Sequence, residues 1–165
     1  MTTRTADLSD EHGDDLLPCQ LQLRSFGGRT AFEGRAVTVR CRDDNAPVRA
    51  AVAEPGEGRV LVVDGGGSLA TALVGDVLAG RAAENGWAGL VVHGAVRDVV
   101  ALADLDSGVL ALGTNPRRGA ATGPGERDVE VAIGGVVVRP GAMVHVDEDG
   151  LLVQAPRLVV HAGDI

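Results

Sequence analysis

The clearest hydrophobic pattern lies in the middle of the chain. Two short apolar runs, Val60–Val63 and Gly89–Val92, flank a segment from about Asp76 to Asn85 in which apolar residues recur at helical spacing. Strands without polar positions are typically buried on both faces of a sheet, and a helical connection makes such neighbours parallel. The pattern therefore predicts a parallel strand–helix–strand unit.

Weaker patterns extend this unit on both sides. Alternating apolar residues predict strands within residues 21–39, and another apolar run predicts a third buried strand after the unit. Helix periodicity and the helix-ending pair Pro55-Gly56 predict further helices. These expected elements are helices at residues 5–17, at residues 46–54 and directly after Asp98, and a strand at residues 109–112.

Beyond Thr114 the pattern changes. A loop rich in proline, arginine and glycine occupies residues 114–126, and short segments that alternate between apolar and polar positions follow it. Such segments, separated by glycine turns, are typical of an antiparallel layer or a small barrel. No linker or repeat divides the chain, so we expect one α/β domain over residues 1–165, with a parallel half and an antiparallel half. The expected strands of the second half are 129–133, 136–138, 143–146 and 151–153.

Composition limits the possible functions. The chain has 165 residues, a net charge of −8 and a pI near 4.9, with arginines scattered among a larger number of acids. Phosphate backbones are bound by clustered cations, so nucleic acid is not an expected direct partner. No run approaches ~18 apolar residues, which argues against a membrane span, and the first residues lack the apolar core of an export signal. We therefore expect a cytoplasmic protein with reduced thiols at Cys19 and Cys41.

The basic residues carry a stronger signal. All fifteen are arginine, and the chain has no lysine. Catalysis through a Schiff base, attachment of pyridoxal phosphate and a Walker-type phosphate lysine are therefore excluded. Any reaction at a carbonyl group must polarise its substrate with a metal ion, an arginine or backbone dipoles.

Three segments are candidates for a site, because ligands of α/β sheets collect where parallel strands end and helices begin. Residues 64–68 follow the first apolar strand, residues 93–98 follow the second, and residues 75–78 open the connecting helix. We expect all three segments to converge on one crevice.

Residue types within these segments indicate binding of an acid and of a metal ion. Arg97 offers a planar fork for a carboxylate or a developing enolate oxygen. Asp98 and Asp76 are hard oxygen ligands of the kind that Mg²⁺ and Mn²⁺ prefer. Exposed backbone amides at the start of the helix would bind a carboxylate group. These amides belong to Gly75, Asp76, Val77 and Leu78.

Each of these residues also has a structural interpretation. Asp76 suits the start of a helix, where it could cap the backbone and favour the dipole. Arg97 and Asp98 could be a neighbouring surface ion pair. His93 could ligate a metal ion or transfer protons, but a hydrogen-bonded structural histidine is the more common case. The case for a site rests on the convergence of the segments.

A set of short motifs stands in a fixed order along the chain: Phe26-Gly27-Gly28-Arg29, Val62–Ser68, Gly86-Trp87-Ala88-Gly89, His93–Asp98, Gly113-Thr114-Asn115-Pro116 and Pro140-Gly141. In this order the motifs closely resemble those of the RraA-like family. That family includes the 4-hydroxy-4-methyl-2-oxoglutarate aldolases and the regulators of ribonuclease activity. The resemblance covers about residues 15–155.

The resemblance implies a fold, an assembly and a site. It implies a swivelling β/β/α fold and a homotrimer with active sites between subunits. Aldolases of the family carry Asp, twenty intervening residues and then Arg-Asp, a pattern that Asp76, Arg97 and Asp98 match. In that scheme Asp98 holds the metal ion, while Arg97 and residues 75–78 bind the substrate. Many members have an acid three residues after the metal aspartate, where this chain has Ala101.

Two functions follow as expectations. The first is a divalent-metal-dependent aldolase, a carbon–carbon lyase that cleaves 4-hydroxy-4-methyl-2-oxoglutarate into two pyruvates and also decarboxylates oxaloacetate through a pyruvate enolate. Mg²⁺ is the expected ion, with Mn²⁺ as the alternative. The second is a non-catalytic regulator that binds and inhibits a ribonuclease, whose basic regions an acidic surface would attract. The aldolase pattern at Asp76, Arg97 and Asp98 favours the enzyme.

Overall fold

The computed structural model describes residues 3–156, which form a mixed α/β fold. The helices are α1 (Thr5–His12), the 3-10 turn η1 (Gly13–Asp15), α2 (Ala46–Val52), α3 (Asp76–Glu84) and α4 (Val99–Ala103). The strands are β1 (Leu16–Pro18), β2 (Arg24–Ser25), β3 (Phe32–Arg40), β4 (Val60–Asp64), β5 (Ala72–Val74), β6 (Gly89–Val96), β7 (Gly108–Thr114), β8 (Glu126–Arg127), β9 (Val131–Ile133), β10 (Val136–Val138), β11 (Met143–Asp147) and β12 (Gly150–Gln154).

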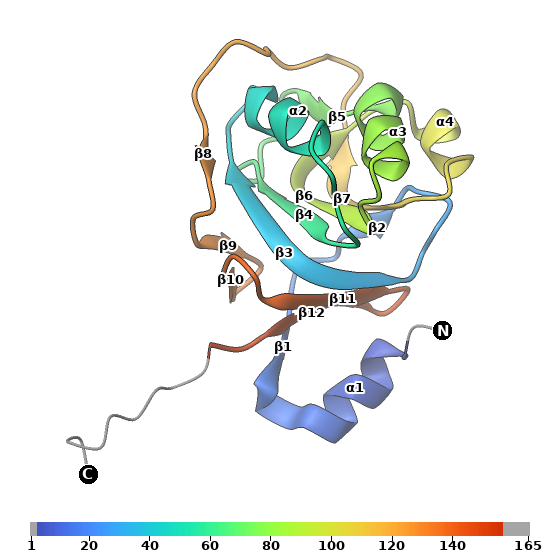
Figure 1. Cartoon of the computed structure of the whole chain (residues 1–165), viewed down its shortest axis with the longest axis vertical. Coiled ribbons are helices and arrows are strands. Elements are labelled where there is room, and N and C mark those ends of the chain that lie inside the picture. The colour runs from blue at the N-terminus through green and yellow to red at the C-terminus, as the bar shows by residue number, and fades with distance from the viewer. Residues whose placement is uncertain (1–2, 157–165) are drawn as a thin grey trace, which may run out of the picture.

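Most of the strands belong to one large mixed sheet (Figure 1). Its ten strands include a continuous path in the order β1-β12-β11-β3-β4-β6-β7-β2, with β5 paired to β6 and β8 paired to β3. Among the described residues, the remaining two strands, β9 and β10, pair with each other as an antiparallel hairpin. The sheet therefore provides the frame on which both halves of the chain are arranged.

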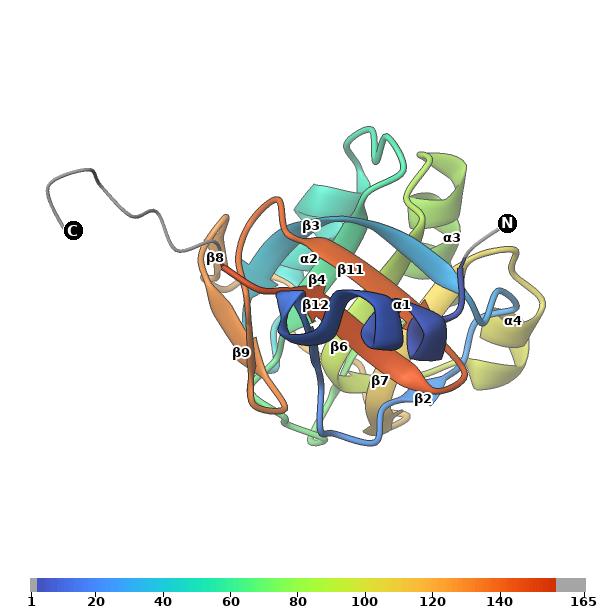
Figure 2. The same cartoon turned by 90° about the horizontal axis from the view of Figure 1, so that it is seen from below.

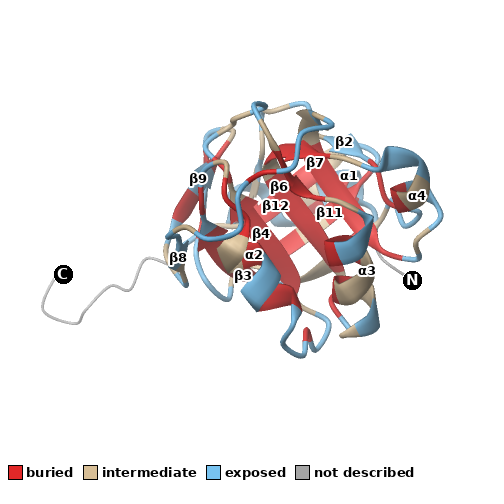
Figure 3. Ribbon diagram, turned by 90° about the horizontal axis from the view of Figure 1, so that it is seen from above, coloured by how far each residue is buried: buried red, intermediate tan, exposed pale blue. Residues whose placement is uncertain are grey.

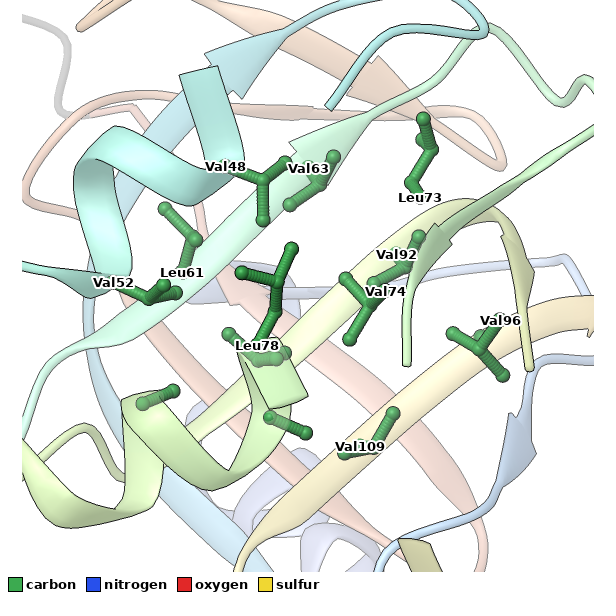
Figure 4. Close-up of a cluster of buried hydrophobic side chains, with 14 of the residues drawn as sticks. Val48, Val52, Leu61, Val63, Leu73, Val74, Leu78, Val92, Val96 and Val109 are labelled. Atoms are coloured by element: carbon green, nitrogen blue, oxygen red, sulfur yellow. The ribbon is translucent and has the colours of Figure 1, made fainter. Parts of the chain in front are cut away.

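Four parallel strands, β3, β4, β6 and β7, form the centre of this sheet, and α2 and α3 cover one face of it (Figures 1 and 3). Val48 from α2 and Leu78 from α3 lie over Leu61, Val63 and Val92 of the sheet, in an aliphatic core (Figure 4). Burying each such side chain contributes about 1.5–3 kcal/mol. The predicted parallel strand–helix–strand unit is confirmed.

Strand β3 joins the parallel half to an antiparallel half. Residues 32–35 of β3 pair antiparallel with β11, whereas residues 36–40 pair parallel with β4. The sheet continues from β11 through β12 to β1, and α1 lies across β11 and β12 (Figure 2). A second apolar cluster fills the space between the sheet and the β9–β10 hairpin. The expected combination of a parallel and an antiparallel half is confirmed.

The helix expected at residues 5–17 ends at His12, and Leu16–Pro18 form strand β1 instead, paired with β12. Two further differences from the sequence-based expectation lie next to the candidate site. Strand β6 continues to Val96, four residues beyond its predicted end, so His93 lies inside the strand and not at its end. Strand β5 had no predicted counterpart and pairs with this extension at Ala95 and Val96. Three residues are too few to produce a periodic pattern, so β5 depends on pairing with β6 and not on local sequence.

The helices between residues 3 and 156 are all short. None of them has the length and the apolar content needed to cross a bilayer.

Candidate functional site

Two turns meet at the carboxyl edge of the parallel strands. One follows β5 at Gly75 and leads into α3, and the other follows β6 at Arg97-Asp98 and leads into α4. The backbone N–H of Arg97 donates to the carbonyl of Val74 at 3.0 Å, which ties the two turns together. The structure therefore brings residues 75–78 and 97–98 to one place, as the sequence predicted.

The Asp98 side chain lies against the first turn of α3. Its Oδ2 accepts a hydrogen bond from the backbone N–H of Asp76 at 3.2 Å and lies 3.9 Å from Nε of Arg97. A Cβ atom at position 75 would approach this oxygen to 2.5 Å, so a larger residue there would displace the Asp98 carboxylate from its present position. Asp98 itself adopts the left-handed conformation, with φ 61° and ψ 42°, which costs about 1–2 kcal/mol. The backbone thus holds this carboxylate at the positive end of a helix.

A pocket of about 170 Å³ opens beside these turns. The side chains of Arg97 and Asp98 are 34% and 38% exposed, so both can contact a ligand. Ala79 donates the first backbone bond of α3, to Gly75, which leaves the N–H groups of residues 77 and 78 unused by the helix. The lining residues are Asn45, Arg49, Ala72, Leu73, Val74, Gly75, Asp76, Val77, Leu78, Arg97, Asp98 and Arg118.

The third predicted segment, residues 64–68, does not line this pocket. Its backbone packs on β6 instead, where the N–H groups of Gly65 and Gly67 both donate to the carbonyl of His93. The His93 ring is mostly buried, with Nδ1 3.5 Å from Oδ1 of Asp64. The expectation that all three segments share one crevice is therefore wrong. Its physical reason is β5, which occupies the position beside the end of β6.

Contacts in the structure distinguish between a structural role and a ligand-binding role for Asp76 and Asp98. Gly75, and not Asp76, is the N-cap residue of α3, and the N–H of Asp76 is bound by the Asp98 side chain, so capping does not explain the Asp76 carboxylate. Asp76 is exposed in the first turn, where its charge suits the helix dipole. The contact between Arg97 and Asp98 is long and partly exposed, and such pairs contribute only about 0–1 kcal/mol. Both side chains therefore remain available to a ligand.

Three polar lining residues were not selected from the sequence: Asn45, Arg49 and Arg118. Asn45 is 4% exposed, and its Nδ2 donates to the carbonyl of Leu73 at 3.3 Å, but its Oδ1 has no hydrogen-bond partner within the described residues. An unpaired buried acceptor costs about 1–3 kcal/mol, so a water molecule or a ligand that donates to this oxygen would stabilise the site. In the sequence alone, Asn45 has the pattern of a helix N-cap, and the two arginines have that of surface charges.

Cys41 is buried at the end of β3, away from this pocket. Burial first, and then the charges of Asp44 and Asp64, together raise the pKa of its thiol to about 12. The thiol therefore stays protonated near neutral pH, which excludes a thiolate nucleophile at this position.

Comparison with known families supports an assignment. The family described as RraA-like, Aldolase/RraA, matches residues 5–153. The chain belongs to the RraA-like family. The match covers every residue of the pocket and both turns that form it.

Three solved structures resemble this RraA-like protein closely enough to be informative. It is 49% identical to the RNA-processing inhibitor RraA from Thermus thermophilus, over 98% of each chain, with a TM-score of 0.90. It is 44% identical to a protein from Geobacillus kaustophilus HTA426 named S-adenosylmethionine:2-dimethylmenaquinone methyltransferase, over 94% of this chain and 97% of that chain, with a TM-score of 0.91. It is 31% identical to an unusual RNase ES inhibitor RraA family member from Streptomyces coelicolor, over 92% of this chain and 79% of that one, with a TM-score of 0.75.

The acids of this RraA-like protein suit a hydrated divalent ion. Mg²⁺ is typically held through one or two carboxylates and keeps several waters, and Asp98 and Asp76 supply two carboxylates at one pocket. Within residues 3–156, no three side chains of His, Cys, Asp or Glu gather into a metal-binding group. The residues therefore fit an ion that shares its coordination with water and substrate, and not a zinc-type site ligated entirely by protein.

Proposed function

We propose that this protein is a divalent-metal-dependent lyase that acts on small 2-oxo acids. The principal reaction cleaves 4-hydroxy-4-methyl-2-oxoglutarate into two molecules of pyruvate, and decarboxylation of oxaloacetate is a second activity of the same site. One observation carries the proposal: the Asp98 carboxylate is held against the start of α3, beside Arg97, and stays partly exposed in a small pocket.

The size of the pocket supports a small acid as the substrate. Its volume of about 170 Å³ lies below the ~300–1,000 Å³ of pockets that bury drug-sized ligands. A short oxo acid suits this space better than S-adenosylmethionine, which the name of the Geobacillus relative contains. The methyltransferase activity in that name is therefore not part of our proposal.

The proposed cleavage breaks the bond between C3 and C4 of the substrate. The electron pair of that bond becomes the enolate of one pyruvate, and C4 becomes the carbonyl carbon of the other as its hydroxyl loses a proton. Asp76, exposed at the start of α3, would receive this proton through a water molecule. Arg97 and the free N–H groups of residues 77 and 78 would bind the C1 carboxylate and orient the 2-oxo group. Protonation of C3 completes the second pyruvate.

Asp98 would hold the divalent ion, with Asp76 beside it. When bound, the ion supplies positive charge that stabilises the enolate oxygen, a role that no lysine can take in this chain. Arg97 would add a fixed positive charge close to the same oxygen. In the decarboxylation of oxaloacetate, the electrons of the breaking C–C bond pass to the enolate as CO₂ leaves. No hydroxyl proton is removed in that reaction, so it does not need Asp76.

Pyruvate release tests the proposed function. Each of the two substrates is incubated with the protein, with and without Mg²⁺, and pyruvate is followed through lactate dehydrogenase. We expect Mg²⁺-dependent release from both substrates. A folded sample that releases pyruvate from neither substrate, in Mg²⁺ or in Mn²⁺, would contradict the proposal.

The Thermus relative supports a second candidate function. It is named an RNA-processing inhibitor, and it is 49% identical to this protein over 98% of each chain. A net charge of −8 would suit contact with basic regions of a ribonuclease. Ribonuclease assays with the unaltered protein and with Asp98→Asn separate the two functions. Inhibition by both proteins, without any pyruvate release, would favour the regulator.

We further propose the swivelling β/β/α architecture, the homotrimer and the cytoplasmic location that were expected from the sequence and the family resemblance. Apolar side chains beside the pocket support an interface there: Val77, Val99 and Val100 are 64%, 38% and 82% exposed. Light scattering should give the mass of three chains, or of six for a dimer of trimers. A mass of one chain in a fully active sample would contradict this assembly.

A further inference from the structure

The pocket contains two positive charges for which the proposed reaction at Asp98 has no use. Arg49 and Arg118 line it together with Arg97, so that arginines outnumber the lining acids, Asp76 and Asp98, in a chain with a net charge of −8. Within the described residues, neither Arg49 nor Arg118 forms an ion pair. Guanidinium groups without a protein carboxylate, facing a small pocket, are suited to bind the carboxylate of a ligand.

Arg118 lies at the opposite end of β5 from Arg97. The backbone of Arg118 forms a parallel bridge with Ala72, the first residue of β5, whereas Arg97 donates to Val74, the last. Gly75 follows Val74 in the chain, and the Asp98 carboxylate lies against Gly75. Three residues of a strand span about 10 Å. The pocket therefore has a metal-binding end and an arginine end, and both ends can contact one short ligand.

The loop that carries Arg118 is fixed to the start of α2 by a buried carboxylate. Asp44 is 8% exposed; its Oδ1 accepts from the N–H of Ala46 at 2.9 Å, and its Oδ2 accepts from Thr122 at 3.2 Å and Gly123 at 2.6 Å. The bond from Ala46, together with those from the loop, holds the pKa of this carboxyl below its usual range. Because Arg49 lies in α2, the Asp44 carboxylate fixes the backbone segments that carry Arg49 and Arg118 relative to each other.

We propose that Arg49 and Arg118 bind the distal carboxylate of a dicarboxylic 2-oxo acid and make the site selective for diacids. The inference rests on the proposed function, which assigns the 2-oxo carboxylate to the Asp98 end of the pocket. Charge-assisted contacts between guanidinium and carboxylate are stronger than neutral hydrogen bonds. A monocarboxylic acid of the same length forgoes these contacts and leaves two cations without a partner, so the arginines discriminate against it.

Binding of two matched acids tests this inference without requiring turnover. 2-Oxoglutarate and 2-oxopentanoate have the same carbon chain and differ in the distal carboxylate, and calorimetry in the presence of Mg²⁺ gives the Kd of each. We expect the unaltered protein to bind 2-oxoglutarate at least about tenfold more tightly. Arg49→Gln and Arg118→Gln should each weaken 2-oxoglutarate binding about tenfold, and change 2-oxopentanoate binding less than about twofold.

Arg117→Gln is the matched control, because Arg117 lies next to Arg118 in the same exposed loop but does not line the pocket. It should leave both Kd values unchanged. Equal binding of the two acids by the unaltered protein, or equal weakening of both acids by the substitutions, would overturn the inference. The same loss in Arg117→Gln would also overturn it, since general surface charge would then explain the effect. The proposed function can fail separately from this inference. In that case the protein would still bind diacids selectively through Arg118, but it would release no pyruvate from oxaloacetate.

Discussion

Asp98 lies two residues after the end of β6 and Asp147 ends β11, but the surroundings of the two carboxylates differ. Asp147, the last residue of β11, is 3% exposed. Its carboxylate accepts hydrogen bonds from the N–H and the hydroxyl of Thr5, at 2.7 and 2.6 Å, and from the N–H of Asp149 at 2.9 Å. The side chain of Asp98 is 38% exposed and accepts one hydrogen bond within the described residues, from Asp76.

This difference separates a structural carboxylate from one that can bind a ligand. A carboxylate has about four lone-pair sites. Asp147 uses two of them to hold Thr5, the first residue of α1, and a third to bind the N–H of Asp149. Burial works to raise the pKa of Asp147, but the hydrogen bonds from Thr5 and Asp149 outweigh it and hold that pKa below its usual range. Asp98 keeps lone pairs for an ion and its waters, so the two residues should fail in opposite ways when substituted.

Asp98→Asn should have the largest effect on activity. The neutral amide keeps the shape of the side chain but loses the charge that attracts a divalent ion, so metal-dependent pyruvate release should fall to background. Thermal unfolding should stay close to that of the unaltered protein, because only one exposed hydrogen bond is altered. A variant that retained full turnover would show that Asp98 serves only the turn before α4.

Asp76→Asn should distinguish between the two reactions. A lost general base costs about 10²–10⁴-fold, and only the aldol cleavage requires removal of a hydroxyl proton. We therefore expect cleavage to fall by this factor and decarboxylation to fall only as far as metal binding weakens. Both rates are measured at saturating Mg²⁺. If they drop by the same factor, Asp76 belongs to the metal site or to the helix start, and not to the proton path.

Asp147→Asn should have the reverse phenotype. It removes a charged acceptor from a buried network, which should lower the free energy of unfolding by about 1.5–3 kcal/mol while pyruvate release per folded molecule stays unchanged. Urea titration followed by circular dichroism measures the change. Asp149→Asn is the control, since that side chain is exposed and should change stability by less than about 0.5 kcal/mol. Equal destabilisation by the two variants would show that the network around Asp147 has no special role.

The pH dependence of stability should show the smallest effect. The folded-state pKa of Asp147 lies below that of an unfolded aspartate, about 3.9. Its contribution is therefore complete above the unfolded pKa and is lost as the pH falls through the folded pKa. Between pH 5 and pH 3 the unaltered protein should lose more stability than Asp147→Asn, as measured by urea unfolding at both values. Identical slopes would assign the acid sensitivity to other carboxylates.

The sequence predicted the elements whose stability comes from their own hydrophobic pattern. The helix expected at residues 76–85 is observed at Asp76–Glu84, and the apolar run 60–63 forms the first four residues of β4. Both have all or most of their apolar positions in the core, so periodicity alone identifies them. The proximity of residues 75–78 to residues 97–98 could be predicted from the parallel strand–helix–strand unit, because the strands of such a unit end, and its helices begin, at the same edge of the sheet.

The features that the sequence did not predict depend on tertiary contacts, which leave no local pattern in the sequence. Strand β5 is held by pairing with the end of β6, and its insertion separates residues 64–68 from the pocket. Asn45 can be identified as a pocket residue only from the structure, where its Nδ2 donates to the carbonyl of Leu73 and its Oδ1 has no partner within the described residues. Arg118 reaches the pocket because its loop is bridged to Ala72. A single sequence carries no information on any of these long-range pairings.

Removal and restoration of the metal ion tests the central claim most directly. Pyruvate release from 4-hydroxy-4-methyl-2-oxoglutarate is measured before EDTA treatment, in excess EDTA, and after Mg²⁺ is returned in excess over the chelator. Because enolate charge must be stabilised without lysine, we predict that EDTA abolishes release and that Mg²⁺ or Mn²⁺ restores it. Full activity in the metal-stripped sample would contradict the account.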